Sequence, residues 1–112
     1  METERLCIKC ISECDIDDIV TLFGNEKNRQ YLGGKIESEN AQLKVNNLIN
    51  DKDNYHFAIR LKKDNAFIGL VSITLYYDSG YKELSYEFLP QFWGNGYASE
   101  SLKFMLHFCK EE

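Results

Sequence analysis

The stretch that decides the fold is Leu89-Pro90-Gln91-Phe92-Trp93-Gly94-Asn95-Gly96-Tyr97-Ala98, near the end of a chain of 112 residues. A half-apolar strand leads into this stretch and a helix with an apolar stripe follows it, so the two glycines lie in a strand-to-helix loop. Such a loop points several unpaired backbone N–H groups at one place, at the positive end of the helix. The pattern favours a phosphate or pyrophosphate site made by the backbone.

A glycine pair in a loop also occurs in three other settings. Gly94 and Gly96 alone also fit a tight connection that binds nothing. A Walker loop requires Gly-Lys-Ser/Thr, whereas Tyr97 and Ala98 follow Gly96. A dinucleotide fingerprint requires a third glycine and an acidic residue roughly 20 residues further on, and the sequence ends before such a βαβ unit could close.

Composition restricts the classes of function. A chain of this length forms one domain, residues 1–112, with a single core of modest size. The net charge of −5 and the lack of a lysine/arginine run disfavour nucleic acid and anionic membranes as partners. No apolar run reaches membrane-spanning length and the first residues do not resemble a secretory signal, so we expect a cytoplasmic protein whose four cysteines are free thiols.

A zinc site is the alternative that the cysteines suggest, and the spacing argues against it. Cys7 and Cys10 lie in an apolar run that is typical of a strand, where residues three apart point to opposite faces. No fourth ligand follows Cys14 at a useful spacing, so we predict no metal.

Hydrophobic periodicity predicts the elements in the order βααβββα. Strands are expected at 5–11, 55–62, 66–77 and 83–89, and helices at 16–23, from 38 to 49, and from 95 to the end. The polar segment 25–34 is interpreted as a loop with about one helical turn, and residues 63–65 and 78–80 as turns. The stripe of the last helix is expected to contain Ala98, Leu102, Met105, Leu106 and Cys109, flanked by Phe104 and Phe108. This order indicates an α/β protein of the α+β type, with a mixed, mainly antiparallel sheet flanked by helices.

Several separate stretches carry a family resemblance. They are Thr3-Glu4-Arg5-Leu6, Tyr31-Leu32-Gly33-Gly34, Phe67-Ile68-Gly69, Glu83-Leu84-Ser85-Tyr86 and the run from Pro90 to Leu102. With them the chain resembles the GNAT superfamily of acetyl-CoA-dependent N-acetyltransferases, and within it the branch similar to ribosomal-protein-alanine N-acetyltransferases. Gln91, Gly94 and Gly96 fit the acyl-CoA signature Gln/Arg-x-x-Gly-x-Gly/Ala of that superfamily.

The resemblance implies a cofactor site and a reaction. Acetyl-CoA would be the cosubstrate, with its pyrophosphate held by the loop and its pantetheine arm paired with the strand before it. A backbone N–H near Leu89 would polarise the thioester carbonyl. The implied cofactor-binding residues are Phe88, Leu89, Gln91, Phe92, Trp93, Gly94, Asn95, Gly96, Tyr97 and Ala98. The implied reaction transfers acetyl to a primary amine, either a protein N-terminus or a small molecule.

An attacking ammonium must first lose a proton, which requires a base or a water that a base orders. Glu83 is our candidate because the resembling enzymes often carry a glutamate at this strand position, and Glu87 is the alternative. Both alternate with Leu84, Tyr86 and Phe88, so they share the polar face of the strand with Ser85. The competing interpretation is that both are solvated strand residues.

One departure from the superfamily pattern bears on activity. The family's domain continues past the loop helix with a fifth strand, another helix and a hairpin, whereas this sequence ends at Glu112. We therefore expect a homo-oligomer whose assembly supplies the remaining part of an N-acetyltransferase site. The alternative is a catalytically inactive acyl-CoA-binding or interaction module.

Overall fold

A four-stranded sheet forms the centre of the structure, a computed structural model that describes residues 1–30, 32–76 and 80–111, the last three by their backbone only. The strands are β1 (Leu6–Cys10), β2 (Tyr55–Leu61), β3 (Phe67–Tyr76) and β4 (Tyr81–Phe88). They pair in the order β1-β2-β3-β4, and each of these pairings is antiparallel. The predicted α+β fold is confirmed. The predicted turn residues 78 and 79 lie outside the described residues.

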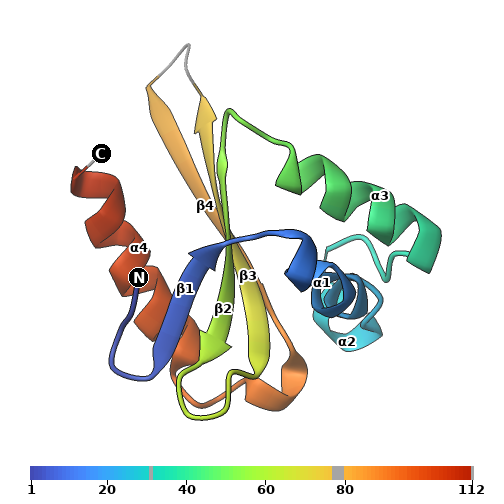
Figure 1. Cartoon of the computed structure of the whole chain (residues 1–112), viewed down its shortest axis with the longest axis horizontal. Helices are drawn as coiled ribbons and strands as arrows, with labels where there is room; N and C mark the ends of the chain where they lie inside the picture. Colours follow the sequence, from blue (N-terminus) through green and yellow to red (C-terminus); the bar gives the residue numbers. More distant parts are fainter. Residues whose placement is uncertain (31, 77–79, 112) are drawn as a thin grey trace.

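Helices cover both faces of this sheet (Figure 1). On one side lie α1 (Ile16–Phe23) and α3 (Ser38–Ile49), with the short α2 (Glu26–Arg29) beside them, and on the other side lies α4 (Tyr97–Glu111). The single helical turn expected in the polar segment 25–34 is α2. A 3-10 turn at Pro90–Phe92 delays the start of α4 by two residues relative to the prediction. None of the helices, over the residues described, combines the length and apolar character that crossing a bilayer requires.

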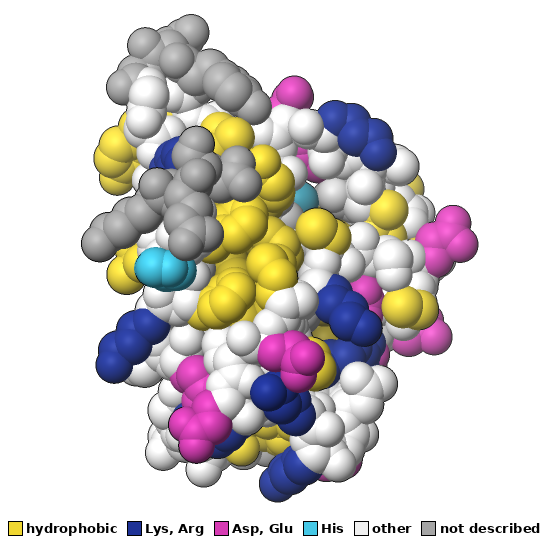
Figure 2. Space-filling view, turned by 60° about the vertical axis from the view of Figure 1, so that its left-hand side comes forward, with side chains coloured by type: hydrophobic (Ala, Val, Ile, Leu, Met, Phe, Trp, Pro, Cys, Tyr) yellow, Lys and Arg dark blue, Asp and Glu magenta, His cyan; other side chains and the backbone are white. Residues whose placement is uncertain are grey.

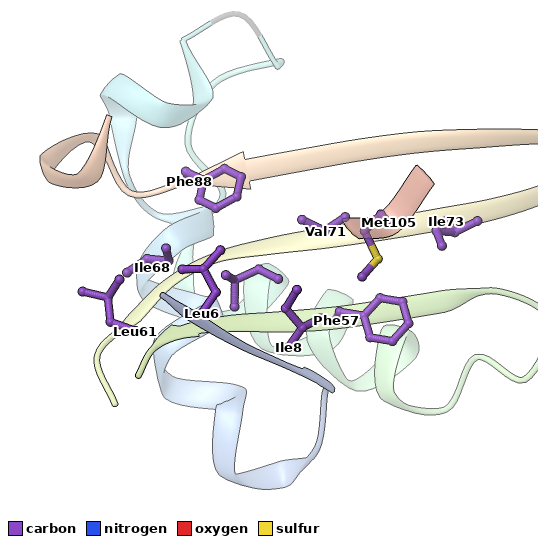
Figure 3. Packing of buried hydrophobic residues seen from close by; sticks show 10 residues of the cluster. Leu6, Ile8, Phe57, Leu61, Ile68, Val71, Ile73, Phe88 and Met105 are labelled. Atoms are coloured by element: carbon purple, nitrogen blue, oxygen red, sulfur yellow. The ribbon is translucent and has the colours of Figure 1, made fainter. Parts of the chain in front are cut away.

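The first core lies between the sheet and α4 (Figure 3). Its buried residues are Leu6, Ile8, Phe57, Ile59, Leu61, Ile68, Val71, Ile73, Phe88 and Met105. Phe108 packs edge-on against Phe57, with 5.7 Å between the ring centroids, and Phe104 also packs on this core.

The predicted stripe of α4 was partly wrong. Met105 is fully buried as predicted, but Leu106 is 56% exposed. Phe104 and Phe108, which were expected to flank the stripe, pack against the sheet instead of Leu106. The helix turns this way because two phenylalanine rings bury more apolar area than a leucine does.

The second core lies between the sheet and α1 and α3. It contains Ile19, Leu22, Phe23, Ala41, Val45, Ala58, Phe67, Leu70 and Leu89. The pairing of β2 with β3 changes register between Ile59 and Arg60. Such a bulge shifts the two-residue alternation by one residue, so Phe67 lies in the same core as Leu70, and Ile68 lies in the first core with Val71. The apolar start of β3 is therefore buried on both faces of the sheet.

Three cysteines lie on β1 or soon after it. Cys7 is half-buried, Cys10 and Cys14 are exposed, and all three are free thiols. Within the described ranges, no three histidine, cysteine or acidic side chains come together as a group that could hold a metal ion.

The turn between α3 and β2 is built around the carboxylate of Asp51. It accepts hydrogen bonds from the backbone N–H groups of Asp53 (2.9 Å) and Asn54 (3.3 Å) and from the side chains of Asn54 (3.0 Å) and His56 (2.8 Å). The hydrogen bond from His56, followed by those from Asn54 and Asp53, lowers the pKa of Asp51 well below its ordinary value.

This lowered pKa predicts a pH dependence of stability. An aspartate whose pKa is lower in the folded than in the unfolded chain, where it is about 3.9, stabilises the fold above that value. Its contribution is lost as the pH falls through and below that value. Urea unfolding at pH 7, 5, 4 and 3 should show a steeper loss of unfolding free energy for the wild type than for Asp51→Asn. The exposed Glu4→Gln serves as control and should follow the wild type. Equal slopes for wild type and Asp51→Asn would contradict this assignment.

Candidate functional site

A groove of about 780 Å³ runs along the end of β4. Strand β4 pairs only with β3 among the described strands, so its other edge offers unpaired backbone groups. The groove is bounded by α2 and the residues after it, by β4, and by the glycine loop with the start of α4. Its lining comprises Lys27, Asn28, Gln30, Leu32, Tyr86, Glu87, Phe88, Phe92, Trp93, Gly94, Gly96, Tyr97, Ala98 and Ser99.

Most of the predicted cofactor-binding residues line this groove. They are Phe88, Phe92, Trp93, Gly94, Gly96, Tyr97 and Ala98. Gln91 and Asn95 are exposed nearby without lining it, and Leu89 is buried in the second core. The structure therefore brings the loop and the strand end together around one groove.

The glycine loop has the geometry of an anion cradle. Gly94 and Gly96 have φ angles of +82° and +79°, which residues with a side chain rarely adopt. The backbone N–H groups of Gly94, Asn95 and Gly96 have no acceptor within the described part of the chain. Helix α4 begins at Tyr97, so its positive end adds to the same place. The loop thus fits a pyrophosphate group, because its free N–H donors belong to or lie beside two glycines that line the groove.

Thr3 and Arg5, near the N-terminus, form hydrogen bonds with Glu100 of α4 and with the glycine loop, and these contacts fix the loop in place. Arg5 Nε donates to Glu100 Oε1 (2.7 Å) and Arg5 Nη1 donates to the carbonyl of Asn95 (2.9 Å). The Arg5 guanidinium also lies 4.5 Å from the centre of the Tyr97 ring. The Thr3 hydroxyl donates to the second oxygen of Glu100. Burial raises the pKa of Glu100, but the hydrogen bonds from Thr3 and Arg5 outweigh it, so this pKa lies below its ordinary value.

The end of β4 narrows the choice of backbone N–H groups near Leu89 that could meet the thioester. The N–H of Leu89 donates to the carbonyl of Ile68 (2.9 Å), so it is not available to a ligand. The Phe88 carbonyl faces the other way and accepts from Trp93 Nε1 (2.8 Å). Because backbone groups alternate in direction along a strand, the N–H of Phe88 lies on the open edge. The donor nearest to the predicted position is therefore the N–H of Phe88.

The two predicted carboxylates lie in different surroundings. Glu87 lines the groove, and its Oε1 accepts from Asn28 Nδ2 and Arg29 Nη1, both at 3.0 Å. The side chains of Arg29 and Glu87 are only 9% and 15% exposed. Glu83 lies four residues earlier on β4, is exposed, and does not line the groove.

Sequence reasoning missed several residues of this site. Arg29 fixes the segment after α2 by donating to the carbonyls of Leu32 (3.0 Å) and Gly34 (3.2 Å) as well as to Glu87. Lys27 places its ammonium group 5.3 Å from the centre of the Trp93 ring and adds a positive charge to the groove. Arg29 is 58 residues from Glu87 in the sequence, and Lys27 and Trp93 are similarly far apart, so no local spacing indicates these contacts across the groove.

An antiparallel sheet with an open β4 edge and a glycine loop before α4 thus meet at one groove. The acetyltransferase (GNAT) domain model matches residues 5–112, and the chain belongs to this family.

Similar proteins extend this finding. The uncharacterized N-acetyltransferase YoaA of Bacillus subtilis (strain 168) is 29% identical over 106 residues, which cover 89% of this chain and 60% of that protein. A GNAT-family acetyltransferase of Bacillus anthracis has a similar structure, with a TM-score of 0.83 and 23% identity over 96% of this chain and 63% of that one. Spermidine N-acetyltransferase of Vibrio cholerae, solved with CoA and spermine, gives a TM-score of 0.79 and 20% identity over 95% and 64%. The chain thus spans somewhat under two thirds of the length of these relatives.

Proposed function

We propose that this chain binds acetyl-CoA along the open edge of β4 and transfers its acetyl group to a primary amine. The observation that carries the proposal is the loop at Gly94–Gly96, whose N–H groups have no acceptor among the described residues and whose two glycines line the groove beside that edge. Acetyl-CoA supplies an acetyl group activated as a thioester. The loop would hold the pyrophosphate, Lys27 would add a positive charge, and the N–H of Phe88 would donate to the thioester oxygen.

The acceptor amine would meet Glu87. Its Oε1 is held by Asn28 and Arg29, whereas its Oε2 has no partner among the described residues and is accessible. A carboxylate oxygen in that position can bind an ammonium group. Primary amines of this kind include polyamines, such as the spermine bound to the Vibrio cholerae enzyme, and protein N-termini, such as the alanine N-termini of ribosomal proteins.

Fluorescence of Trp93 offers a direct test of cofactor binding. Trp93 is the only tryptophan in the sequence, its indole lines the groove, and it is 46% exposed. Adding CoA should change its emission along a saturable curve, because the ligand would exclude water from the ring. A flat titration up to millimolar CoA, matched by calorimetry without heat, would overturn the proposal.

The alternative, an inactive acyl-CoA-binding module, shares this site and differs only in turnover. Mass spectrometry of spermine incubated with acetyl-CoA and the protein separates the two. Saturable Trp93 quenching without acetylated product would favour the binding module, and product that increases with protein concentration would favour the enzyme.

The roles of the two carboxylates give a paired prediction. If Glu87 binds the acceptor, Glu87→Gln should lower kcat/KM for spermine by about 10²-fold, because the ammonium loses its charged partner. Glu83→Gln should lower the rate by a similar factor only if Glu83 is the base, with a smaller loss at high pH where the amine is already neutral. Initial rates of both variants from pH 6 to 10 show which carboxylate binds the acceptor and whether Glu83 is the base. A Glu87→Gln enzyme with wild-type kinetics would remove Glu87 from the site.

Self-association remains part of the proposal. Figure 2 shows hydrophobic side chains gathered on the side of the molecule that carries α4. Leu106 is 56% exposed, and on β4 Tyr81 and Tyr86 are 62% and 52% exposed. Apolar surface next to an open strand edge favours pairing with a second copy. Sedimentation at micromolar concentration should show a dimer or larger species, and a cooperative melt of a monomer would contradict this.

A further inference from the structure

A second, smaller pocket of about 240 Å³ lies on the side of the sheet that α3 covers. It shares Leu32, Tyr86 and Glu87 with the main groove, so the two meet at the carboxylate proposed to bind the acceptor. Ser72 of β3 and Ser85 of β4 also line it, and these two residues are direct partners across the strands. A ligand at Glu87 therefore lies beside a pair of hydroxyl groups.

Ser72 is the first member of a hydrogen-bonded chain that leads away from this pocket. Its Oγ lies 2.7 Å from His56 Nδ1, and His56 Nε2 lies 2.8 Å from Asp51 Oδ2. A carboxylate only accepts, so Nε2 carries the proton and Nδ1 accepts from the Ser72 hydroxyl. His56 is 8% exposed, whereas the Asp51 side chain is 21% exposed. These three side chains thus connect the pocket to the surface through the buried imidazole of His56.

The reaction proposed above requires a proton acceptor that Glu87 does not readily supply. An ammonium group must lose a proton before its nitrogen can attack a thioester. Protonating Glu87 would break its ion pair with Arg29, in which both side chains are largely buried. The imidazole of His56, in contrast, has two ring nitrogens, so it can accept a proton on one side and release one on the other.

We propose that Ser72, His56 and Asp51 form a proton relay for the acceptor amine, an inference that rests on the proposed function. The ammonium gives one proton to Ser72 Oγ while the hydroxyl proton of Ser72 passes to His56 Nδ1. The resulting imidazolium is stabilised by Asp51 and later releases a proton to solvent on that side. The neutral amine then attacks the thioester carbon, the C–S bond breaks, and the second nitrogen proton goes to the departing sulfur.

Some charged groups around the relay favour a protonated His56 and others oppose it. Asp51, from the turn before β2, and Glu87, from β4, favour a positive charge on His56. Lys44 of α3 and Arg29 of α2 also line the pocket and oppose it. The competing role for the three residues is purely structural, since they tie the turn before β2 to β3. A test must therefore use a readout that a structural role would not change.

The first measurement is the pH profile of acetyl transfer to spermine by the full chain. Ser72→Ala should lower kcat/KM by roughly 10²-fold at pH 7, and the loss should shrink towards pH 10, where the amine is already neutral. Ser72→Thr keeps the hydroxyl and should restore most of the rate. Ser85→Ala is the matched control, because Ser85 lines the same pocket and has no hydrogen bond to His56 among those described; it should behave as wild type. A pH-independent loss in Ser72→Ala, or an equal loss in Ser85→Ala, would overturn the relay.

The second measurement does not depend on turnover. Nitrogen-15 spectra of His56, assigned with His56→Gln, should show the Nε2–H tautomer, and spermine should shift its titration midpoint in the wild type but not in Ser72→Ala. An Nδ1–H tautomer, or a midpoint that spermine leaves unchanged, would overturn the relay. Trp93 fluorescence with CoA is followed in the same samples. If Trp93 does not respond, the proposed cofactor binding fails, while the His56 spectra still decide the relay.

Discussion

Gly69→Ala is expected to lower the free energy of unfolding by about 3 kcal/mol, a large loss for a single methyl group. Gly69 of β3 lies directly opposite Phe88 of β4. A Cβ at this position would lie 2.5 Å from Phe88 Cδ1 and 2.6 Å from the carbonyl oxygen of Glu87. The ring could turn, but the carbonyl belongs to the backbone of a paired strand, so β4 would have to move. Urea unfolding followed by circular dichroism measures the loss.

Gly24→Ala is the matched control for this substitution. Gly24 follows α1 with a φ of −83°, and the nearest atom to its added Cβ would be 3.4 Å away, at ordinary contact distance. Its unfolding free energy should change by less than about 1 kcal/mol. Equal stability of the two variants would mean that β3 and β4 are not packed as closely at Gly69 as the structure has them.

Gly96→Val is expected to weaken CoA binding by well over tenfold, which is more than about 1.4 kcal/mol. Gly96 has a φ of +79°, and its added Cβ would lie 3.4 Å from Arg5 Nη2. A branched side chain would therefore strain the loop and occupy the space through which a diphosphate must approach the N–H groups. Calorimetry with CoA measures the change.

The control for this variant is Gly80→Val, which introduces similar backbone strain at a position outside the groove. Gly80 has a similar φ of +70°, no atom within 4 Å of its added Cβ, and a position at the start of β4, away from the groove. Gly80→Val should retain wild-type CoA affinity. If a folded Gly96→Val variant also retains it, the loop does not hold the pyrophosphate.

Much of this fold could be predicted because its signals are local. Alternation identified β2, helical spacing identified α1 and α3, and the glycine pair located the loop before α4. The face of α4 could not be predicted in detail, because Leu106 and Phe108 are equally apolar and only the shape of the sheet, with Phe57 below Phe108, decides between them.

For a similar reason, only part of the candidate site could be predicted from the sequence. Strand alternation placed Glu83 and Glu87 on one face, but only the position of α2 shows that Glu87 reaches the groove. The contacts of Arg5 with Glu100 and Asn95 join residues 90 to 95 positions apart. A single sequence contains no signal for such pairs, although Thr3–Leu6 and Glu100 were both part of the family resemblance.

Backbone amide NMR during a CoA titration tests the central claim, that the cofactor lies along β4 with its pyrophosphate on the glycine loop. The account predicts the largest shifts at the N–H groups of Gly94, Asn95, Gly96 and Phe88, and almost none in the turn at Asp51–Asn54. The absence of shifts at saturating CoA would contradict this claim. Shifts concentrated near Cys7 of β1 and Arg60 of β2, on the side of the sheet away from β4, would also contradict it.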